Sequence, residues 1–246
     1  MQMLKRILLL FVLIASIVYL LLAVFALNKK PDSLLCSDIE LVIKDKAYEE
    51  FISKKEIESI LKKKNLEIKG KELSTITTQK VEEAVKSHPL VANAECYKTP
   101  SGKIFIEVEQ RIPLLRIMNQ GGGGYYIDSE GEPMPVNQNS LTYLIVVTGN
   151  TTKEFAKNKL LDLGLFLKND SFWDAQIEQI NVRRDKTIEL VPRVGNHIVY
   201  LGSIDDFENK LGRLKKFYSE GLNKVGWNKY SRINLEFSNQ IICTKR

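Results

Sequence analysis

An uncharged apolar stretch at residues 7–27 constrains this 246-residue chain more than any other feature. As a helix, its 21 residues would extend about 31 Å, enough to cross a hydrocarbon core of ~30 Å. The stretch lacks the polar face of a buried globular helix, and it is longer than the ~7–15 apolar residues of a signal peptide. A lipoprotein anchor at Cys36 is disfavoured, because the bulky Leu34 and Leu35 precede it. We therefore predict a retained transmembrane helix over 7–27.

The charges that flank this stretch are nearly balanced. Lys5, Arg6 and the amino terminus stand before it, whereas Lys29 and Lys30 follow it. Because no second apolar stretch follows, we expect a six-residue cytoplasmic tail (1–6), an N-terminus inside the cell, and an exported region over 28–246.

Composition narrows the classes of function. Hydrophobic residues make up 44% of the chain and charged residues 27%, which is ordinary for a folded protein. Lys and Arg are interspersed with Asp and Glu rather than gathered in a stripe with aromatic residues, so we expect no nucleic-acid partner. Three Cys and two His exclude a disulfide framework and a four-Cys zinc site.

Motifs for catalysis are missing from the sequence. It contains no Gly-x-Ser-x-Gly, His-Glu-x-x-His or Cys-x-x-Cys. The four glycines at 121–124 lead into Tyr125 and Tyr126 rather than into a helix, so they predict a hairpin connection and not a phosphate loop. We expect no enzymatic activity, no metal, no cofactor and no small-molecule substrate.

The first part of the exported region predicts a compact α+β unit. Residues 28–36 form a linker, and a domain over 37–112 follows. Ser53 and Glu56 make a capping box for the first of its helices, and Pro89 ends the second. The predicted elements are a strand at 39–43, helices at 54–64 and 78–87, and strands at 90–98 and 104–108.

The second part, 113–246, predicts a strand-dominated domain. We place the boundary near Arg111–Leu114, where Pro113 interrupts pairing. Phe172 and Trp173 are interpreted as a core anchor, with a carbohydrate platform as the alternative. The predicted strands are 114–119, 125–128, 133–136, 141–148, 177–182, 187–191, 197–201, 232–237 and 240–245, and the predicted helices are 151–169 and 204–222.

Three segments in this order resemble the FtsQ/DivIB family of bacterial cell-division proteins. They are His88–Glu95 (HPLVANAE), Ile104–Pro113 (IFIEVEQRIP) and Tyr125–Gly131 (YYIDSEG). Gln110 stands where the family commonly has Glu. The resemblance implies an α+β fold: an N-terminal transmembrane helix, a β-α-α-β-β POTRA domain, and a distal mixed β domain with two helices.

The resemblance also implies a function. Such a protein is a non-enzymatic divisome scaffold that binds single-span partners of the FtsB and FtsL type and helps to couple septum assembly to peptidoglycan synthesis. It lies in the cell inner membrane at the division septum, with its folded domains in the periplasm. The alternative is an envelope enzyme tethered to the membrane, such as a peptidoglycan hydrolase.

In the family, the partner surface combines the last strands with a basic residue on an earlier strand. The matching positions here are Arg183, Phe237, Gln240, Ile241, Ile242 and Cys243. The apolar C-terminal segment would accept a partner strand through backbone hydrogen bonds, which is β-augmentation. The alternative is that this strand lies inside the sheet.

Overall fold

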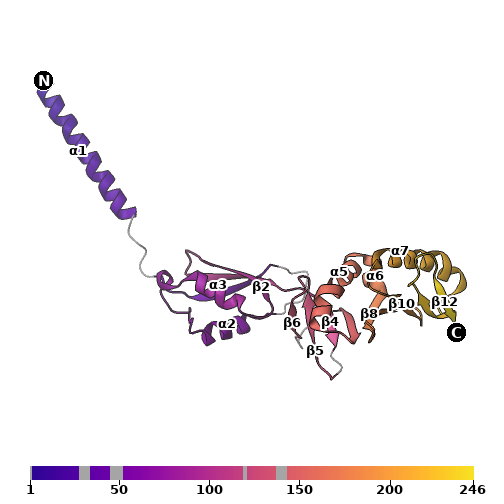
Figure 1. Ribbon diagram of the computed structural model, residues 1–246. Coiled ribbons are helices and arrows are strands. Elements are labelled where there is room, and N and C mark those ends of the chain that lie inside the picture. Colours follow the sequence, from indigo (N-terminus) through magenta and orange to yellow (C-terminus); the bar gives the residue numbers. More distant parts are fainter. Residues whose placement is uncertain (1, 28–33, 45–51, 119–120, 137–142) are drawn as a thin grey trace.

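Helices and strands fall into three parts along the chain: one long helix, a small three-stranded sheet with two helices, and a nine-stranded sheet (Figure 1). The computed structural model describes all residues except 1, 28–33, 45–51, 119–120 and 137–142. The predicted linker therefore lies mostly outside the described residues.

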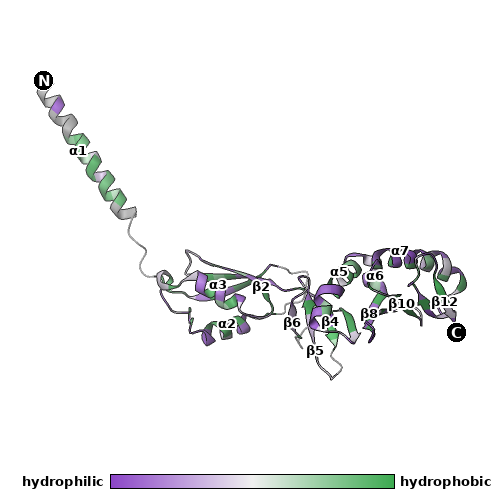
Figure 2. Cartoon of the chain, in the orientation of Figure 1, coloured by the Kyte–Doolittle hydropathy of each residue, from purple (hydrophilic) through white to green (hydrophobic). Residues whose placement is uncertain are grey.

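Helix α1 (Gln2–Leu27) contains the apolar stretch, and Figure 2 shows hydrophobic residues along its middle. Within it, side chains are described for Arg6 and for residues 11–24. Among the residues that the structure describes, no helix combines the length and the apolar character that a membrane crossing requires. The membrane span therefore stays a prediction.

The elements of the small sheet follow one another along the chain in the predicted order of strand, helix, helix, strand, strand. Its strands run β1-β3-β2, with β1 parallel and β2 antiparallel to the central β3. Two helices and a short 3₁₀ turn follow β1 along the chain. The elements are β1 (Asp38–Ile43), α2 (Lys54–Lys63), η1 (Leu73–Thr75), α3 (Thr78–Lys86), β2 (Val91–Lys98) and β3 (Lys103–Gln110).

Local chemistry explains these elements. The capping box is confirmed, because the Glu56 N–H donates to the Ser53 hydroxyl at 3.3 Å and the Ser53 N–H donates to the Glu56 carboxylate at 2.7 Å. On β3, the alternating Ile104, Ile106 and Val108 are fully buried, as their period of two predicts.

One edge of this sheet is covered by a side chain. The backbone N–H of Cys96 on β2 donates to the Glu82 carboxylate of α3 at 2.9 Å. An edge strand with unpaired N–H groups is a template for pairing with other chains, so Glu82 protects β2 at this point.

The second sheet begins at Pro113 and runs to the C-terminus. Its strand order is β12-β11-β10-β9-β8-β7-β4-β5-β6. The strands are β4 (Pro113–Met118), β5 (Gly124–Asp128), β6 (Pro133–Pro135), β7 (Ile145–Gly149), β8 (Ile177–Val182), β9 (Ile188–Pro192), β10 (Ile198–Gly202), β11 (Tyr230–Asn234) and β12 (Ile242–Lys245). The helices are α4 (Lys153–Phe155), α5 (Leu161–Asn169), α6 (Ser171–Gln176), α7 (Phe207–Phe217) and α8 (Asn223–Val225), with π-helical turns η2 (Ala156–Leu160) and η3 (Tyr218–Leu222).

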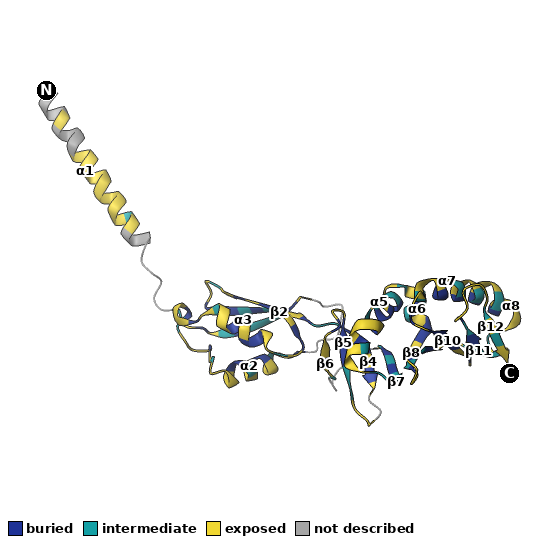
Figure 3. Cartoon of the chain, viewed as in Figure 1, coloured by how far each residue is buried: buried dark blue, intermediate teal, exposed yellow. Residues whose placement is uncertain are grey.

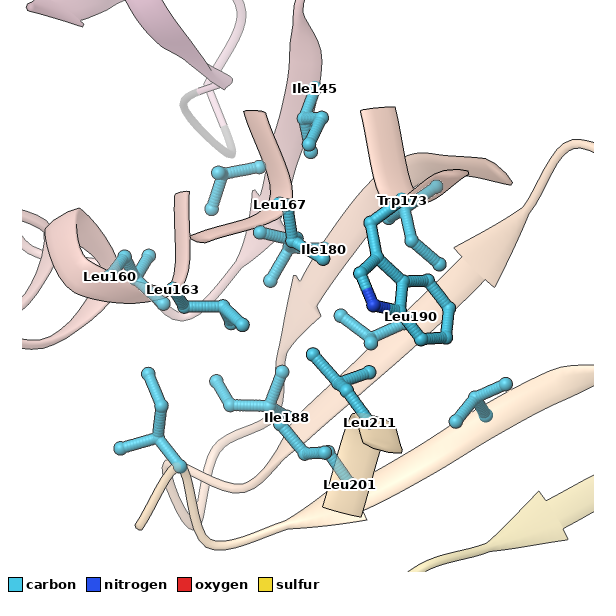
Figure 4. Close-up of a cluster of buried hydrophobic side chains, with 14 of the residues drawn as sticks. Ile145, Leu160, Leu163, Leu167, Trp173, Ile180, Ile188, Leu190, Leu201 and Leu211 are labelled. Atoms are coloured by element: carbon cyan, nitrogen blue, oxygen red, sulfur yellow. The ribbon is translucent and has the colours of Figure 1, made fainter. Parts of the chain in front are cut away.

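The helices cover one face of the large sheet, as Figure 1 shows for α5, α6 and α7. One row of cross-strand neighbours, Ile180, Leu190, Val199, Ile233 and Cys243, packs into the core under them. In Figure 4, side chains from helices and strands converge around Trp173.

The adjacent row of the same strands faces away from the helices. It consists of Asn181, Glu189, Tyr200, Asn234 and Ile242. We call this side the open face. In the described part of the chain, α5, α6 and α7 cover the opposite side, and polar and charged residues of these strands gather on the open face.

Several elements differ from the prediction. The expected strand at 141–148 begins at Ile145, and its first two residues lie outside the described part of the chain. Helix α6, which carries Phe172 and Trp173, was not predicted as a separate helix. The predicted helix over 204–222 begins at Phe207, after Asp206 in a left-handed conformation with φ of 57°.

The two sheets meet at a network centred on Arg111. Its guanidinium donates to the Asp128 carboxylate, with Nε at 2.7 Å and Nη2 at 2.6 Å, and also to the carbonyls of Pro89, Glu132 and Pro133. Tyr126 and Met134 of the large sheet pack into the core of the small one. The domain division at 112/113 stays a prediction, but the sheets do change there.

Candidate partner-binding edge

Strand β12 is the outermost strand at one end of the large sheet. It pairs with β11 antiparallel, and within the described residues no strand lies on its other side. Ile242 is 44% exposed, and Thr244 and Lys245 are exposed as well. Figure 3 shows exposed and partly exposed residues at this end of the chain. The outer side of β12 therefore offers backbone donors and acceptors to another strand.

A loop over 235–241 sets the start of β12. Arg213 of α7 holds it, since its guanidinium donates to the carbonyls of Phe237 at 2.6 Å, Leu235 at 3.1 Å and Gln240 at 3.4 Å. A groove of about 430 Å³ lies between α7 and this loop, with Phe217 and Ile241 among its lining. One helix residue thus fixes the backbone that leads into the edge strand.

The structure places the predicted C-terminal residues around this edge, but not all in a strand. Phe237 and Gln240 lie in the loop and are exposed, Phe237 by 45%. Ile241 packs partly against the core, and Ile242 lies on the open face. Cys243 is half-buried and packs on the helix-covered side, so its side chain is turned away from Ile242.

Arg183 lies just beyond β8, on the open face, and is not free. Its Nη1 pairs with Glu189 Oε1 at 3.1 Å, and its side chain is 44% exposed. Arg232 of β11 pairs with the same oxygen, also at 3.1 Å. Both guanidinium groups lie over the Tyr200 ring, at 5.8 Å for Arg183 and 4.6 Å for Arg232.

Glu189 is the centre of this cluster and is largely buried, with a side chain 11% exposed. Burial raises the pKa of its carboxyl, but hydrogen bonds from Asn181 and Arg183 and the charge of Arg232 outweigh burial and hold that pKa below its ordinary value. Glu189 is therefore a carboxylate at neutral pH.

An aromatic cluster supports β10 from the helix side. His197, just before β10, is buried and shares a hydrogen bond of 2.8 Å between its Nε2 and the Tyr218 hydroxyl. Trp227 packs on both rings. Burial lowers the pKa of His197, so this imidazole is neutral near pH 7 and acts in packing.

Sequence reasoning missed three residues in this part of the sheet. Arg213, Glu189 and Arg232 lie far apart in the sequence, and none belongs to a motif. The only signal available was the alternation of charged residues within two predicted strands.

A family model described as "FtsQ/DivIB, C-terminal related" matches residues 112–244, over half of the chain. The chain belongs to the FtsQ/DivIB family. A second model, described as a POTRA-like domain, matches residues 34–109, which contain the small sheet. Together the two matches confirm the resemblance seen in the sequence and the mixed α+β fold.

A curated relative supports this assignment. The FtsQ/DivIB chain described here is 28% identical over 173 residues to "Cell division protein FtsQ" of Rhodothermus marinus. The match covers 66% of this chain and 63% of the relative, so the chain spans less than two thirds of that protein's length.

Proposed function

We propose that this FtsQ/DivIB protein is a non-enzymatic divisome scaffold that binds FtsB- and FtsL-type single-span proteins by adding a partner strand to β12. The observation that carries the proposal is the position of β12 at the end of the sheet with an exposed outer side. Backbone bonds would supply affinity, and flanking side chains would supply specificity. Through these partners it helps to couple septum assembly to peptidoglycan synthesis.

In this proposal, α1 anchors the protein in the inner membrane and residues 28–246 lie in the periplasm at the division septum. The described side chains of α1 over 11–24 are apolar except for the hydroxyl groups of Ser16 and Tyr19, and all but that of Ala23 are exposed, so they need an apolar cover. We expect a reporter that is active only outside the cytoplasm to work when fused after Arg246. Activity of a cytoplasm-only reporter at that position would contradict the orientation.

The alternative of a tethered peptidoglycan hydrolase has no support in the site. Trp173 is 1% exposed and lies in the core, so it cannot stack on a sugar. The rings of Trp173 and Phe172 pack edge to face with their centroids 4.8 Å apart, as expected for residues that anchor a core.

Phe237→Ala tests the side-chain part of the proposed interface. An exposed aromatic residue beside an edge strand has the character of a hot spot, so we expect a loss of about 2 kcal/mol, or ~30-fold in Kd. The measurement is a titration of the full chain in nanodiscs with the exported parts of its FtsB- and FtsL-type partners.

Tyr143→Ala is the matched control, because Tyr143 is 86% exposed and precedes β7, far along the sheet from β12. Both variants should keep the parent's melting temperature. Equal affinity of Phe237→Ala and the parent would place the interface elsewhere.

A further inference from the structure

A short stretch of chain joins α1 to the POTRA-like domain. Six residues, 28–33, separate Leu27 at the end of α1 from Leu34, the first described residue of the domain. The seven residue steps from Leu27 to Leu34 extend over at most about 25 Å, whereas a domain of this size is about 30 Å wide. The part of the domain that contains Leu34 therefore lies closer to the end of α1 than the far side of the domain can.

Backbone hydrogen bonds fix the place where the chain enters this domain. The Cys36 N–H donates to the Lys71 carbonyl, and the Leu73 N–H donates to the Leu34 carbonyl, both at 2.8 Å. Between these two bonds, Leu35 forms an antiparallel bridge with Glu72. The side chain of Leu35 is 57% exposed. The entry to the domain thus carries an exposed apolar side chain beside the loop over 69–73.

Lysine residues gather around this entry. Residues 62–80 contain six lysines and only two acidic residues, Glu67 and Glu72. The six lysines are exposed, and they come from the end of α2, from the loop that follows it and from α3. We call them the lysine cluster, which consists of Lys62, Lys63, Lys64, Lys69, Lys71 and Lys80.

Most charges of the lysine cluster have no acidic partner in the protein. Within the described residues, Lys69 is the one member that forms an ion pair, with Asp38 at 3.5 Å. Lysines on the sheet of the same domain differ, because Lys103 pairs with Glu40 and Lys44 pairs with Glu95. The positive charge of this domain is therefore left over at the entry and is balanced on the sheet.

A hollow brings separate parts of the lysine cluster together. Its volume is about 150 Å³, and Lys71 and Lys80 both line it, together with Leu66. Lys64 comes two residues before Leu66. Lysines from α2, the loop and α3 thus share one surface, and that surface includes the loop that pairs with the entry segment.

We propose that this surface docks on the membrane, with the lysine cluster on the phosphate groups of anionic phospholipids and Leu35 inserted at the level of the headgroups. The inference rests on the proposed function, since it takes α1 as the membrane anchor. Attraction between lysines and an anionic lipid surface decays within a Debye length, so the short tether makes the contact effective. The exposed leucine adds apolar burial. Docking restricts the tilt of the POTRA-like domain against the membrane.

The test measures how fast each lysine of the full chain in nanodiscs reacts with an amine-acylating reagent, read by mass spectrometry. Nanodiscs of phosphatidylcholine alone are compared with nanodiscs of equal parts of phosphatidylcholine and phosphatidylglycerol. We expect the lysine cluster to react about fivefold more slowly on the anionic discs, the factor that one lysine gains near such a surface, and to recover at high salt. Lys86, Lys159 and Lys224 serve as internal controls, because they are exposed and lie outside the cluster.

Two triple variants with the same loss of charge separate docking from general attraction. The variant in the cluster should abolish the protection of the lysines that remain there, and the variant outside the cluster should leave that protection unchanged. General attraction of a basic protein predicts the same loss in both. The variants are Lys64→Gln/Lys71→Gln/Lys80→Gln and Lys86→Gln/Lys159→Gln/Lys224→Gln.

Leu35→Ser tests the apolar part of the contact. Its side chain is exposed, so the melting temperature should stay that of the parent. We expect the protection of the lysine cluster on anionic discs to fall by about half, because burial of one leucine side chain is lost. Full protection in Leu35→Ser would overturn the insertion of Leu35.

The outcomes distinguish this inference from the proposed function. If the lysine cluster reacts equally on both discs while the chain binds its partners, docking is wrong and the edge-strand function stands. Equal loss in both triple variants also overturns docking. Protection of the cluster in a chain that fails to bind the partners supports docking and overturns the edge-strand function. A chain that does not enter nanodiscs overturns both, because the membrane anchor is then wrong.

Discussion

Replacing Ile242 by Pro is expected to abolish binding of the FtsB- and FtsL-type partners, with a loss of more than about 100-fold in Kd. Proline removes a backbone donor and fixes φ, and at residue 242 that donor faces β11, because the alternate residues Thr244 and Arg246 direct their backbone groups to that side. The change therefore detaches the start of the edge strand that the partner would extend. The side chain of Ile242 is 44% exposed, so the change leaves no cavity in the core.

Two companions sharpen this experiment. Ile242→Ala keeps the backbone N–H and should lose far less affinity than the proline variant. In an antiparallel ladder, consecutive residues direct their N–H groups to opposite sides, so Cys243→Pro attacks the other side of β12. Both prolines should remove the partner, Ile242→Pro through the inner side of β12 and Cys243→Pro through its outer side, while circular dichroism shows that the rest of the sheet stays folded. Parent-like binding by both would refute strand addition at β12.

Arg111→Ala is expected to give the largest loss of stability, about 3–5 kcal/mol, because it leaves a buried carboxylate without its partner. Asp128 is 5% exposed at its side chain, and the Arg111 side chain is 16% exposed. The other oxygen of Asp128 accepts from the N–H groups of Glu130 at 3.0 Å and Glu132 at 2.8 Å. The β5–β6 turn and the domain junction should therefore loosen together.

The measurement is urea unfolding of the full chain together with hydrogen exchange. Loss should concentrate in the amides around 128–133, and Lys157→Ala, which removes an exposed ion pair with Glu132, serves as the control with little effect. Arg111→Ala/Asp128→Asn should cost less than Arg111→Ala, since the neutral amide leaves no charge stranded and its oxygen can still accept from Glu130 and Glu132. Unchanged exchange at the junction in Arg111→Ala would show that the pair does not hold the two sheets together.

The fold of the small sheet could be predicted because its signals are local. Ser53 and Glu56 predict the start of a helix, and the alternation of apolar and polar residues from Ile104 to Val108 predicts a half-buried strand. Each signal acts within a few residues, so the sequence displays it directly.

The C-terminal edge was predicted less well, because a distant residue shapes it. The sequence predicts a strand that continues to Phe237. In the structure, β11 ends at Asn234, and the chain continues as the loop that Arg213 holds. No local sequence pattern indicates that Arg213, on a helix, donates hydrogen bonds to three carbonyls of this loop. The side-chain direction of Cys243, by contrast, could be predicted from the sequence, because neighbouring residues of a strand point to opposite faces and Cys243 follows Ile242.

The cluster at Glu189 illustrates a further limit. Arg183 was predicted from the family pattern as a partner contact, but the structure shows that an acidic residue of the same chain already contacts it. Cross-strand neighbours such as Glu189 and Tyr200 become visible only when the strand order is known. The predicted contact of Arg183 with a partner remains a prediction.

The outer strands of the two sheets differ in how well their backbone groups are protected. This difference affects how much of the protein a cell can make. Glu82 blocks an N–H of β2, whereas β12 has no such cover among the described residues. An unshielded terminal strand pairs with whatever strand is abundant, including that of a second copy. If a cell made more of this protein than of its partners, the excess copies would thus self-associate through β12. The amounts of the protein and of its partners therefore need to be matched.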